Sequence, residues 1–567
     1  MNRLCTALVT AATLCLAQQA TRAGGGPENV FLIVNPNSAD SLEIANEYVA
    51  MRGIPTGNVF YLPWAPQAWR TMGADFRDKM LKPILQEIDK RKLAGQIDNL
   101  VYSSNFPWQI DFRDLHVAKE GRSPDIPVAS LTGASYLYQF VLSNDRRIAA
   151  LNNNFYFAQA TAGVTKSQAF HGRVGWSPAA KPDDKGIHYL MSTVLGVTTG
   201  AGTTVDETVH YLRRAANADG TRPQGGFYYM VNGKNPRSTA RHDGFAAAVA
   251  ELEALGQNAV IVNGIVPKGQ RAVLGITCGA PQAPLAGSNS TLQPGALVDN
   301  LTSAGGQLTA RKNGTGQTPL TDYLKYGAAG ASGTVVEPFA IRQKFPSPDL
   351  HVHYARGCCL SESFYQAVQG PYQLLIAGDP LCQPWAVPGE VSLTLPGLGG
   401  MIDGVITLAP QVAYPDLRAV GHLELFVDGV RVAAGRGLAP LTLDTTKLPD
   451  GPHQLTVVAV DNTPIEVQSR WSQEVIVKNG SDALQVTAAG GPRITGDEAV
   501  LAVAGTRDAE TIVTHNGREL GRVTGREGQL RIKTSLLGPG PVQIEARIEG
   551  DEPLVSRPLH LQIARER

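Results

Sequence analysis

The stretch NVFLIVN at residues 29–35, followed by SADSLEIANEYVAMRG at residues 38–53, decides the fold. The first segment is an uninterrupted apolar run, which is typical of a strand buried on both faces. The second has helical spacing of its apolar residues, with Ser38 or Asp40 as the N-cap and Gly53 as the stop. A buried strand followed at once by a helix predicts a β-α unit of a mostly parallel sheet.

The same alternation continues to about Pro388, and we expect an α/β fold with a mostly parallel sheet flanked by helices. Two stretches, residues 144–224 and 280–317, are polar, Gly-rich and poorly periodic, so we expect long loops over the sheet there. The further predicted strands are 58–63, 97–107, 225–233, 271–279, 332–338 and 372–380, and the further predicted helices are 75–93, 246–256, 318–327 and 361–368.

After Pro388 the sequence changes to short alternating strands and contains an internal duplication. Residues 441–459 (LTLDTTKLPDGPHQLTVVA) align with residues 530–547 (LRIKTSLLGPGPVQIEAR) at an offset of 89, which matches Gly451 to Gly540. This period with alternating strands predicts two all-β sandwiches of immunoglobulin-like size.

The N-terminus has the pattern of a secretory signal peptide: an early Arg3, an apolar run, then small residues that end near Ala20 or Ala23. No later stretch approaches the roughly 18 apolar residues that span a bilayer. We therefore expect an exported protein, periplasmic or extracellular, without a transmembrane segment in the mature chain. The predicted divisions are 1–23, signal peptide; 27–387, α/β domain; 389–479, first immunoglobulin-like sandwich; and 482–565, second sandwich.

The overall charge and the absence of several known motifs disfavour some classes of function. Lys plus Arg and Asp plus Glu are both 50, so no overall field attracts nucleic acid, and we expect partners among envelope or extracellular proteins instead. There is no GxSxG elbow, no phosphate-binding GxxxxGK[ST] and no dinucleotide GxGxxG after a strand. These omissions disfavour common hydrolases, NTPases and dehydrogenases, and we expect no cofactor.

The cysteines of the mature chain are Cys278, Cys358, Cys359 and Cys382. The helix predicted after Cys358 and Cys359 and the strand that runs back toward Cys382 bring these residues together. Because an exported chain meets oxidising conditions, we expect a disulfide from Cys358 or Cys359 to Cys382, with about 3 kcal/mol of stabilisation.

The segment HVHYA contains His351 and His353, which would point to the same face if the segment were a strand. Two imidazoles on one face can share a zinc ion, with Glu337, Asp349 or Asp379 as a third ligand. No HExxH and no paired CxxC supports this site, so we expect no metal and interpret both residues as hydrogen-bonded loop histidines.

Cys278 ends the predicted strand RAVLGITCG, and open α/β sheets place their ligands at the carboxyl ends of strands. It is either a nucleophile with a base in reach or a small buried apolar group. Acidic residues near other strand ends could line the same crevice, although Asp379 could equally cap a turn before Pro380. They are Asp111, Asp114, Glu337 and Asp379.

Several segments resemble known proteins. The first β-α unit and the closing strand YQLLIAGDPLCQPW resemble the gingipain-type α/β domain of the caspase-gingipain class of cysteine peptidases. PGALVDNLTSAGG (294–306), GAAGASGTVVEPFA (327–340), FPSPDLHVHYARGC (345–358) and AGDPLCQPW (377–385) resemble more closely a family of exported bacterial proteins from species that carry the exosortase protein-sorting system.

The resemblance implies a dyad in which a His within Gly-His-Gly at one strand end works with a Cys at the end of the next strand. This sequence has Cys278-Gly279 at the position of the His, and Thr302 and Ser303 at the position of the Cys. If Cys278 is itself the nucleophile, its His is His210 or His242, and Cys278, His242 and Glu337 form the catalytic set.

Two hypotheses follow. In the first, which we favour, the chain is a non-catalytic exported protein that acts in binding or assembly. In the second, it is a cysteine-dependent peptidase or hydrolase of the gingipain-like class.

Overall fold

The computed structural model describes residues 25–115, 126–158, 164–309, 316–396 and 399–565. The predicted signal peptide lies outside these residues. In the described ranges, the structure contains no helix that is long and apolar enough to cross a bilayer.

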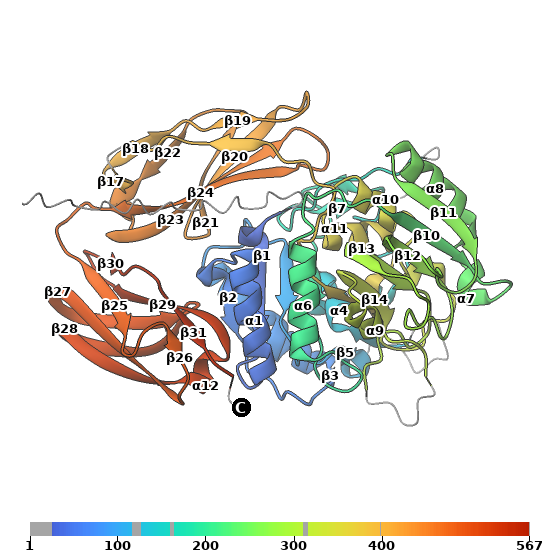
Figure 1. The fold of residues 1–567 in the computed structure, drawn as a ribbon, viewed down its shortest axis with the longest axis horizontal. Coiled ribbons are helices and arrows are strands. Elements are labelled where there is room, and N and C mark those ends of the chain that lie inside the picture. The colour runs from blue at the N-terminus through green and yellow to red at the C-terminus, as the bar shows by residue number, and fades with distance from the viewer. Residues whose placement is uncertain (1–24, 116–125, 159–163, 310–315, 397–398, 566–567) are drawn as a thin grey trace, which may run out of the picture.

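A ten-stranded sheet forms the centre of the first part of the chain, in the order β11-β10-β12-β13-β14-β15-β9-β4-β1-β2 (Figure 1). All neighbouring strands are parallel except β14 and β15, which are antiparallel. β15 thus runs opposite to β14, and its pairing with β9 consists of one residue pair, Ala377 with Val194. Its strands are β1 (Val30–Val34), β2 (Val59–Tyr61), β4 (Asn99–Tyr102), β9 (Met191–Val194), β10 (Gly226–Val231), β11 (Asn258–Asn263), β12 (Val273–Cys278), β13 (Leu292–Asn300), β14 (Gly330–Thr334) and β15 (Leu374–Gly378).

Helices lie on both faces of this sheet (Figure 1). On one face α1 packs against α6, and α6 against α9; elsewhere α10 packs against both α11 and α8. The helices are α1 (Ala39–Arg52), α2 (Gly73–Asp75), α3 (Lys82–Lys90), α4 (Leu131–Tyr136), α5 (Tyr138–Leu142), α6 (Val205–Ala216), α7 (Pro236–Thr239), α8 (Phe245–Ala254), α9 (Leu320–Lys325), α10 (Leu350–Ala355) and α11 (Leu360–Ala367), and a π-helical segment (Phe76–Leu81) joins α2 to α3.

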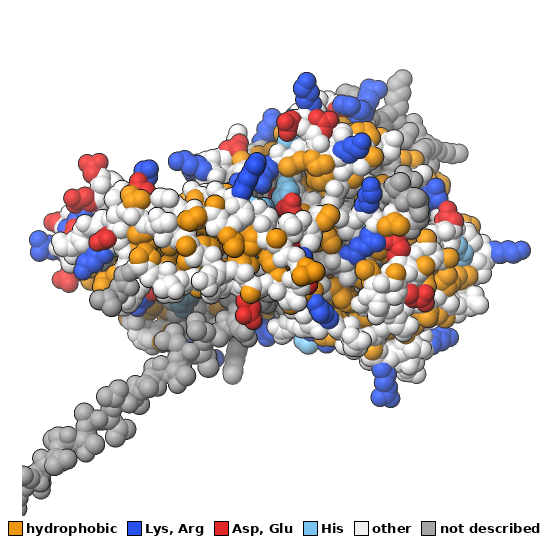
Figure 2. Space-filling view, turned by 90° about the horizontal axis from the view of Figure 1, so that it is seen from above, with side chains coloured by type: hydrophobic (Ala, Val, Ile, Leu, Met, Phe, Trp, Pro, Cys, Tyr) orange, Lys and Arg blue, Asp and Glu red, His pale blue; other side chains and the backbone are white. Residues whose placement is uncertain are grey.

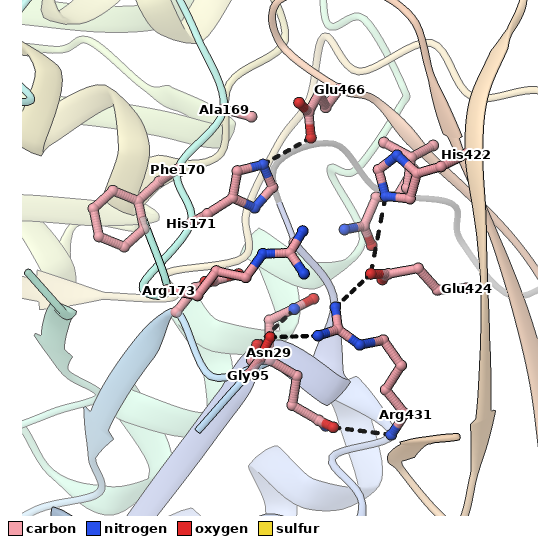
Figure 3. Close-up of a pocket in the computed structure, with 15 residues that line it drawn as sticks. Asn29, Gly95, Ala169, Phe170, His171, Arg173, His422, Glu424, Arg431 and Glu466 are labelled. Atoms are coloured by element: carbon pink, nitrogen blue, oxygen red, sulfur yellow. Dashed lines mark hydrogen bonds and ion pairs between the residues drawn. The ribbon is translucent and has the colours of Figure 1, made fainter. Parts of the chain in front are cut away.

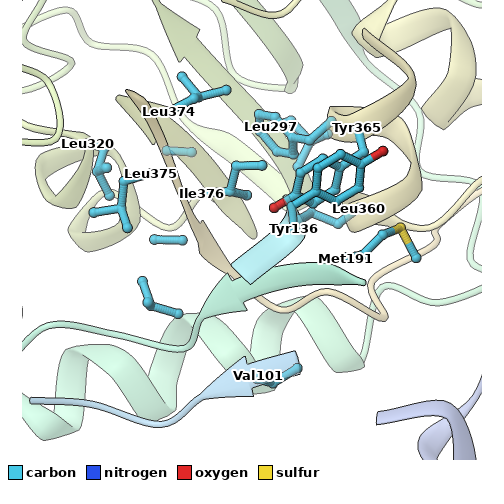
Figure 4. Close-up of a cluster of buried hydrophobic side chains, with 14 of the residues drawn as sticks. Val101, Tyr136, Met191, Leu297, Leu320, Leu360, Tyr365, Leu374, Leu375 and Ile376 are labelled. Carbon is cyan, nitrogen blue, oxygen red and sulfur yellow. The ribbon is translucent and has the colours of Figure 1, made fainter. Parts of the chain in front are cut away.

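The core between sheet and helices is apolar and rich in tyrosine. Tyr136 stacks on Tyr365 at a ring-centroid distance of 4.0 Å and on Tyr189 at 4.6 Å, next to Ile376 and Met191 (Figure 4). Tyr365 donates its hydroxyl to the Ser192 carbonyl at 2.9 Å, so the buried oxygen is satisfied. Smaller sheets lie nearby: β3 (Arg70–Met72), β5 (Gln109–Asp111) and β6 (Val128–Ser130) form one, and β7 (Trp176–Ser177) pairs with β8 (Lys181–Pro182).

Two β-sandwich regions follow, each with its own hydrophobic core. In the view from above, hydrophobic side chains are scattered over the first of them (Figure 2). The first contains β16 (Glu390–Ser392), β17 (Met401–Ile402), β18 (Val405–Leu408), β19 (Gln411–Ala413), β20 (Val420–Val427), β21 (Val430–Arg436), β22 (Leu441–Asp444), β23 (Gly451–Asp461) and β24 (Gln468–Val477). The second contains β25 (Leu484–Ala488), β26 (Arg493–Ile494), β27 (Glu498–His515), β28 (Arg518–Lys533), α12 (Thr534–Leu537), β29 (Gly540–Ile548), β30 (Leu554–Val555) and β31 (Leu559–Ile563). The predicted fold class, a mostly parallel α/β sheet followed by β-sandwiches, is confirmed.

The sandwiches pack against the α/β part. Arg470 of the first forms a buried ion pair with Glu28. In the second, the carbonyls of Leu537 and Pro539 accept hydrogen bonds from Asn46 Nδ2 on α1, at 3.0 and 2.8 Å. The first contact reaches the segment before β1 and the second reaches α1, so both sandwiches lie on the side of the sheet that ends in β2 (Figure 1).

The prediction of loops over 144–224 and 280–317 is wrong in part. These stretches contain β9 in the middle of the sheet, β13, and the amphipathic helix α6. Thr204 caps α6 in a capping box with Glu207, a signal that is visible in the sequence. β9 spans four residues and is buried throughout, so it has no alternating pattern to detect.

Candidate functional site

The first candidate site lies at the carboxyl ends of β12 and β13, which are adjacent and parallel. Cys278 ends β12 and aligns with Asn300, which ends β13; Thr302 and Ser303 follow. Open α/β sheets bind their ligands at the carboxyl ends of their strands.

A buried ion pair lies at the carboxyl ends of β12 and β13. Arg241 and Asp299 are 3% and 1% exposed and form a salt bridge. The Arg241 guanidinium also donates to the Cys278 carbonyl at 2.7 Å and to the Pro346 carbonyl at 2.9 Å, and Ser332 Oγ donates to Asp299 at 2.5 Å. The polar groups of this pair are therefore bonded to other groups of the fold.

The Cys278 thiol is 2% exposed. Burial raises its pKa to about 12, with Asp299 adding to the rise and Arg241 opposing it. Since the thiolate is the nucleophilic form, a thiol with this pKa is unreactive near neutral pH. No imidazole is among the charged groups that shift this pKa.

The other members of the predicted catalytic set have partners of their own. His242 Nε2 lies 2.7 Å from Ser238 Oγ, and burial together with Arg241 lowers its pKa. Glu337 accepts the Phe339 N–H at 2.8 Å, in the loop after β14. His210 is exposed on α6, a helix that packs against α1 and α9. The structure thus brings Cys278 together with Arg241 and Asp299, two residues that the sequence did not suggest as its neighbours. The one sequence signal was Asp299 itself, a single charged residue within the apolar run ALVDN.

Asp379 lies at the opposite edge from Cys278, so the expectation of one shared crevice is wrong for this residue. It follows β15, which runs antiparallel to β14. Its carboxylate pairs with Arg52, accepts the Tyr48 hydroxyl at 3.0 Å, and accepts the Leu381 N–H at 3.2 Å. It therefore ties α1 to the turn after β15, as the capping interpretation predicted.

Asp111 and Asp114 both serve local structure. Asp111 is fully buried at the end of β5 and is paired with Arg70 and Arg113. Asp114 accepts the Ala74 N–H at 2.8 Å, at the beginning of α2.

His351 and His353 lie on α10, a helix, and not on a strand. Their side chains therefore diverge. The ring of His351 packs 5.3 Å from that of Phe227, whereas His353 Nδ1 lies 2.9 Å from Ser167 Oγ. Burial lowers the pKa of each to about 3, so both stay neutral. Over the described ranges, no cluster of three or more His, Cys, Asp or Glu side chains has the arrangement of a metal site.

The predicted disulfide is not formed; the four cysteines of the described chain are buried thiols. The backbones do meet, since Leu360 N–H donates to the Cys382 carbonyl at 2.9 Å, but the side chains diverge. Cys358 Sγ faces Gln366 on α11, at 3.5 Å. Cys382 Sγ contacts the Tyr354 hydroxyl at 3.1 Å and donates to the Ala215 carbonyl of α6 at 3.3 Å. The short α-β unit thus places Cys358 and Cys382 in different side-chain clusters.

A second group of titratable residues lies between the α/β part and the first sandwich (Figure 3). His171 Nε2 is 2.8 Å from Glu466, and Arg431 is 2.6 Å from Glu424. Burial raises the pKa of Asp98 to about 6. The cavity encloses about 20 Å³, which is room for about one water molecule. This group therefore joins two parts of the chain and offers no space for a ligand.

The larger opening is a cleft of about 850 Å³ between the α/β part and both sandwiches. The C-terminal end of α1 lines it together with residues of β23, β24 and β29, including Gln454, Ser472, Gln543 and Glu545. Clefts of this size between domains are typical of binding sites.

No protein-family model matches the chain, and no curated protein matches it. Solved structures with similarity include a protease, with 10% identity and a TM-score of 0.41 over 80% of this chain and 98% of that one. The fibronectin(III)-like modules of Clostridium thermocellum CbhA match 31% of this chain over 93% of their own, with 18% identity and a TM-score of 0.14. Latent PorU from Porphyromonas gingivalis matches 32% of this chain over 20% of its own, with 15% identity and a TM-score of 0.14.

Proposed function

We propose that the chain is an exported protein of the cell envelope or the extracellular space that acts by binding or assembly, without hydrolytic activity. The observation that carries the proposal is the buried Arg241–Asp299 ion pair at the ends of β12 and β13. A hydrolase needs a nucleophile with a base in reach and open space for the scissile bond. Here the space holds a satisfied ion pair beside a protonated, buried thiol.

The positive part of the proposal rests on the cleft and on the sandwiches. The cleft is lined by three parts of the chain and has the volume of a binding site. Its charges are already neutralised in part, by Glu28 with Arg470 and by Asp428 with His453. The resemblance to exported proteins of exosortase-carrying species supports an envelope setting for such a binding protein.

The alternative, a cysteine-dependent hydrolase, has one supporting observation: Cys278 ends β12 at the edge where a ligand would bind. Thiol labelling separates the two proposals. The purified exported chain is treated with iodoacetamide near neutral pH, with and without unfolding, and each cysteine is followed by mass spectrometry. We expect Cys278 to stay unlabelled until the chain unfolds. Rapid labelling in the native state, together with a processing activity that Cys278→Ala abolishes, would establish the hydrolase instead.

A further inference from the structure

One edge of the ten-stranded sheet is open. β11 forms that edge, and within the described parts of the chain it pairs with β10 alone. The other edge strand, β2, is covered by the second sandwich: Arg518 stacks over the Tyr61 ring, and Asn516 Nδ2 donates to the Tyr61 hydroxyl at 3.2 Å. β11 lies at the end of the molecule farthest from the sandwiches (Figure 1). The rest of the chain therefore leaves room beside it.

β11 has none of the features that usually protect an edge strand. Its sequence, Asn-Ala-Val-Ile-Val-Asn at 258–263, contains no charge and no proline. Ile261 is 46% exposed, and Ile265 just beyond the strand is 38% exposed. Natural edge strands are blunted by lysine, proline, bulges or a covering segment, and an apolar edge without them is a template for another strand.

The hydrogen bonds between β11 and β10 determine which backbone groups of β11 can bind another strand. Gly264 donates its N–H to the Val231 carbonyl of β10 at 2.9 Å. Because hydrogen bonding alternates along a parallel strand, Val260 and Val262 also bond to β10. The N–H and C=O groups of Ala259, Ile261 and Asn263 then face away from the sheet.

We propose that this edge binds a second copy of the chain, in an antiparallel pairing centred on Ile261. A two-fold axis at Ile261 places Ile261 opposite its own copy and Ala259 opposite Asn263, so every outward residue meets an outward residue. Val260 then lies opposite Val262 on the face away from α8, because Ile261 is in register with Tyr229, whose ring lies 5.1 Å from that of Phe245 on α8. The strand is uncharged, so no like charges meet across the axis. Such a self-complementary contact is an isologous interface, and it joins the two sheets into one.

The helix beside β11 suits the same arrangement. α8 packs on β11, and four of its five exposed residues are alanines, Ala246, Ala247, Ala250 and Ala254; the fifth is Glu253 in the last turn. In the two-fold pairing, α8 and its copy lie on the same face of the joined sheet. Methyl side chains allow two helices to approach closely, since the distance between helix axes depends on the side chains at the contact. The pairing does not depend on whether Cys278 reacts.

The first test measures the mass of the purified exported chain by light scattering over a range of concentrations. We expect twice the mass of the chain. Ile261→Lys places two like charges directly opposite each other, and we expect a rise of at least about tenfold in the dimer Kd. Val405→Lys is the control, because Val405 is an exposed strand residue of the first sandwich, 66% exposed. Unchanged circular dichroism and thermal unfolding establish that each variant is folded.

The second test detects the pairing directly, by the formation of a disulfide cross-link between two copies. Ile261→Cys puts a thiol opposite its own copy, at the Cα separation of about 5.5 Å that a disulfide spans. The cysteines of the described chain are buried, so mild oxidation should give a covalent dimer of Ile261→Cys and none of Val405→Cys. A chain that is monomeric at every concentration, or a dimer that Ile261→Lys leaves unchanged and Ile261→Cys does not cross-link, would overturn the proposal.

Discussion

At the scale of single residues, the chemistry of the candidate site is set by desolvation. Asp299 and Arg241 are buried charged groups. The energetic cost of burying each charge is offset because the other neutralises it. Cys278 beside them has no cationic group close enough to overcome its burial, so its pKa rises. The same edge of the sheet that could host catalysis is thereby occupied by a structural pair.

The first prediction concerns this pair. Arg241→Met leaves Asp299 buried without its partner, and we expect a loss of about 3–5 kcal/mol in the free energy of unfolding, measured in urea. The double variant with Asp299→Leu should lose less than Arg241→Met alone, because no uncompensated charge remains. Arg342→Ala, which breaks the exposed pair with Asp243, is the control and should cost less than about 1 kcal/mol. Equal losses in all three variants would contradict this account.

The second prediction concerns Asp98, in the group that joins the α/β part to the first sandwich. Its folded pKa, about 6, lies above the unfolded value near 3.8, so the fold favours the protonated carboxyl. The stabilisation is complete below about pH 4 and is lost as the pH rises through about 6. A shift of this size corresponds to about 3 kcal/mol.

The variant Asp98→Asn tests this pH dependence of stability, because the amide oxygen can still accept the Gly172 N–H that Asp98 accepts at 2.7 Å. We expect the stability of Asp98→Asn relative to the native chain to grow between about pH 4 and pH 7, measured by urea unfolding across this range. Taking the difference removes the titration of groups that both chains share. A difference that is flat with pH would show that Asp98 does not titrate as described.

At the scale of elements, the duplication predicted from sequence is visible as matching structure. β22 is followed by a 3-10 turn (Thr445–Lys447) and β23; the end of β28 is followed by α12 and β29. The matched glycines begin β23 and β29, and both have positive φ: Gly451 at 129° and Gly540 at 97°. These φ values favour glycine over any residue with a Cβ.

The third prediction compares these two positions. A Cβ on Gly451 would meet the Val555 carbonyl oxygen at 2.2 Å, whereas a Cβ on Gly540 meets only side chains of α1, at 3.5 Å or more. Both alanine variants pay for strained backbone, about 1–3 kcal/mol. Gly451→Ala should lose more because a backbone oxygen cannot move aside, and thermal unfolding of both variants gives the ranking. The reverse order would rule out this contact as the cause.

The sequence was most informative where an element has a strong local pattern. The β1–α1 unit, the closing strand β15 and the duplicated sandwich segments all follow from apolar spacing and capping. β9 was missed because a short strand buried on both faces has no alternation, and α10 was misjudged because HVHYA is too short for its period to be decided. The Arg241–Asp299 pair joins residues on separate elements, and no local pattern reports such a contact.

At the scale of the whole molecule, the second sandwich is held against α1 by a few polar contacts. Asn46 Nδ2 donates to the carbonyls of Leu537 and Pro539, and Arg565 pairs with Glu43 and Asp206. These contacts protect the β2 edge of the sheet at the same time, because they hold the sandwich in place over it.

The last prediction is that these contacts fix the position of the second sandwich. Asn46→Ala leaves backbone carbonyls at α12 without their donor, which costs about 1–3 kcal/mol where such groups are buried. Combined with Arg565→Ala, it should let the second sandwich move away from α1 while both parts stay folded, because the sandwich has its own core. Small-angle scattering should then show a larger radius of gyration, and hydrogen exchange should rise on α1 and not inside β27 or β29. Asn37→Ala with Arg147→Ala, which removes exposed polar contacts elsewhere, is the matched control. Scattering identical to that of the native chain would mean that apolar packing alone holds the sandwich, since the polar contacts would then add nothing to its position.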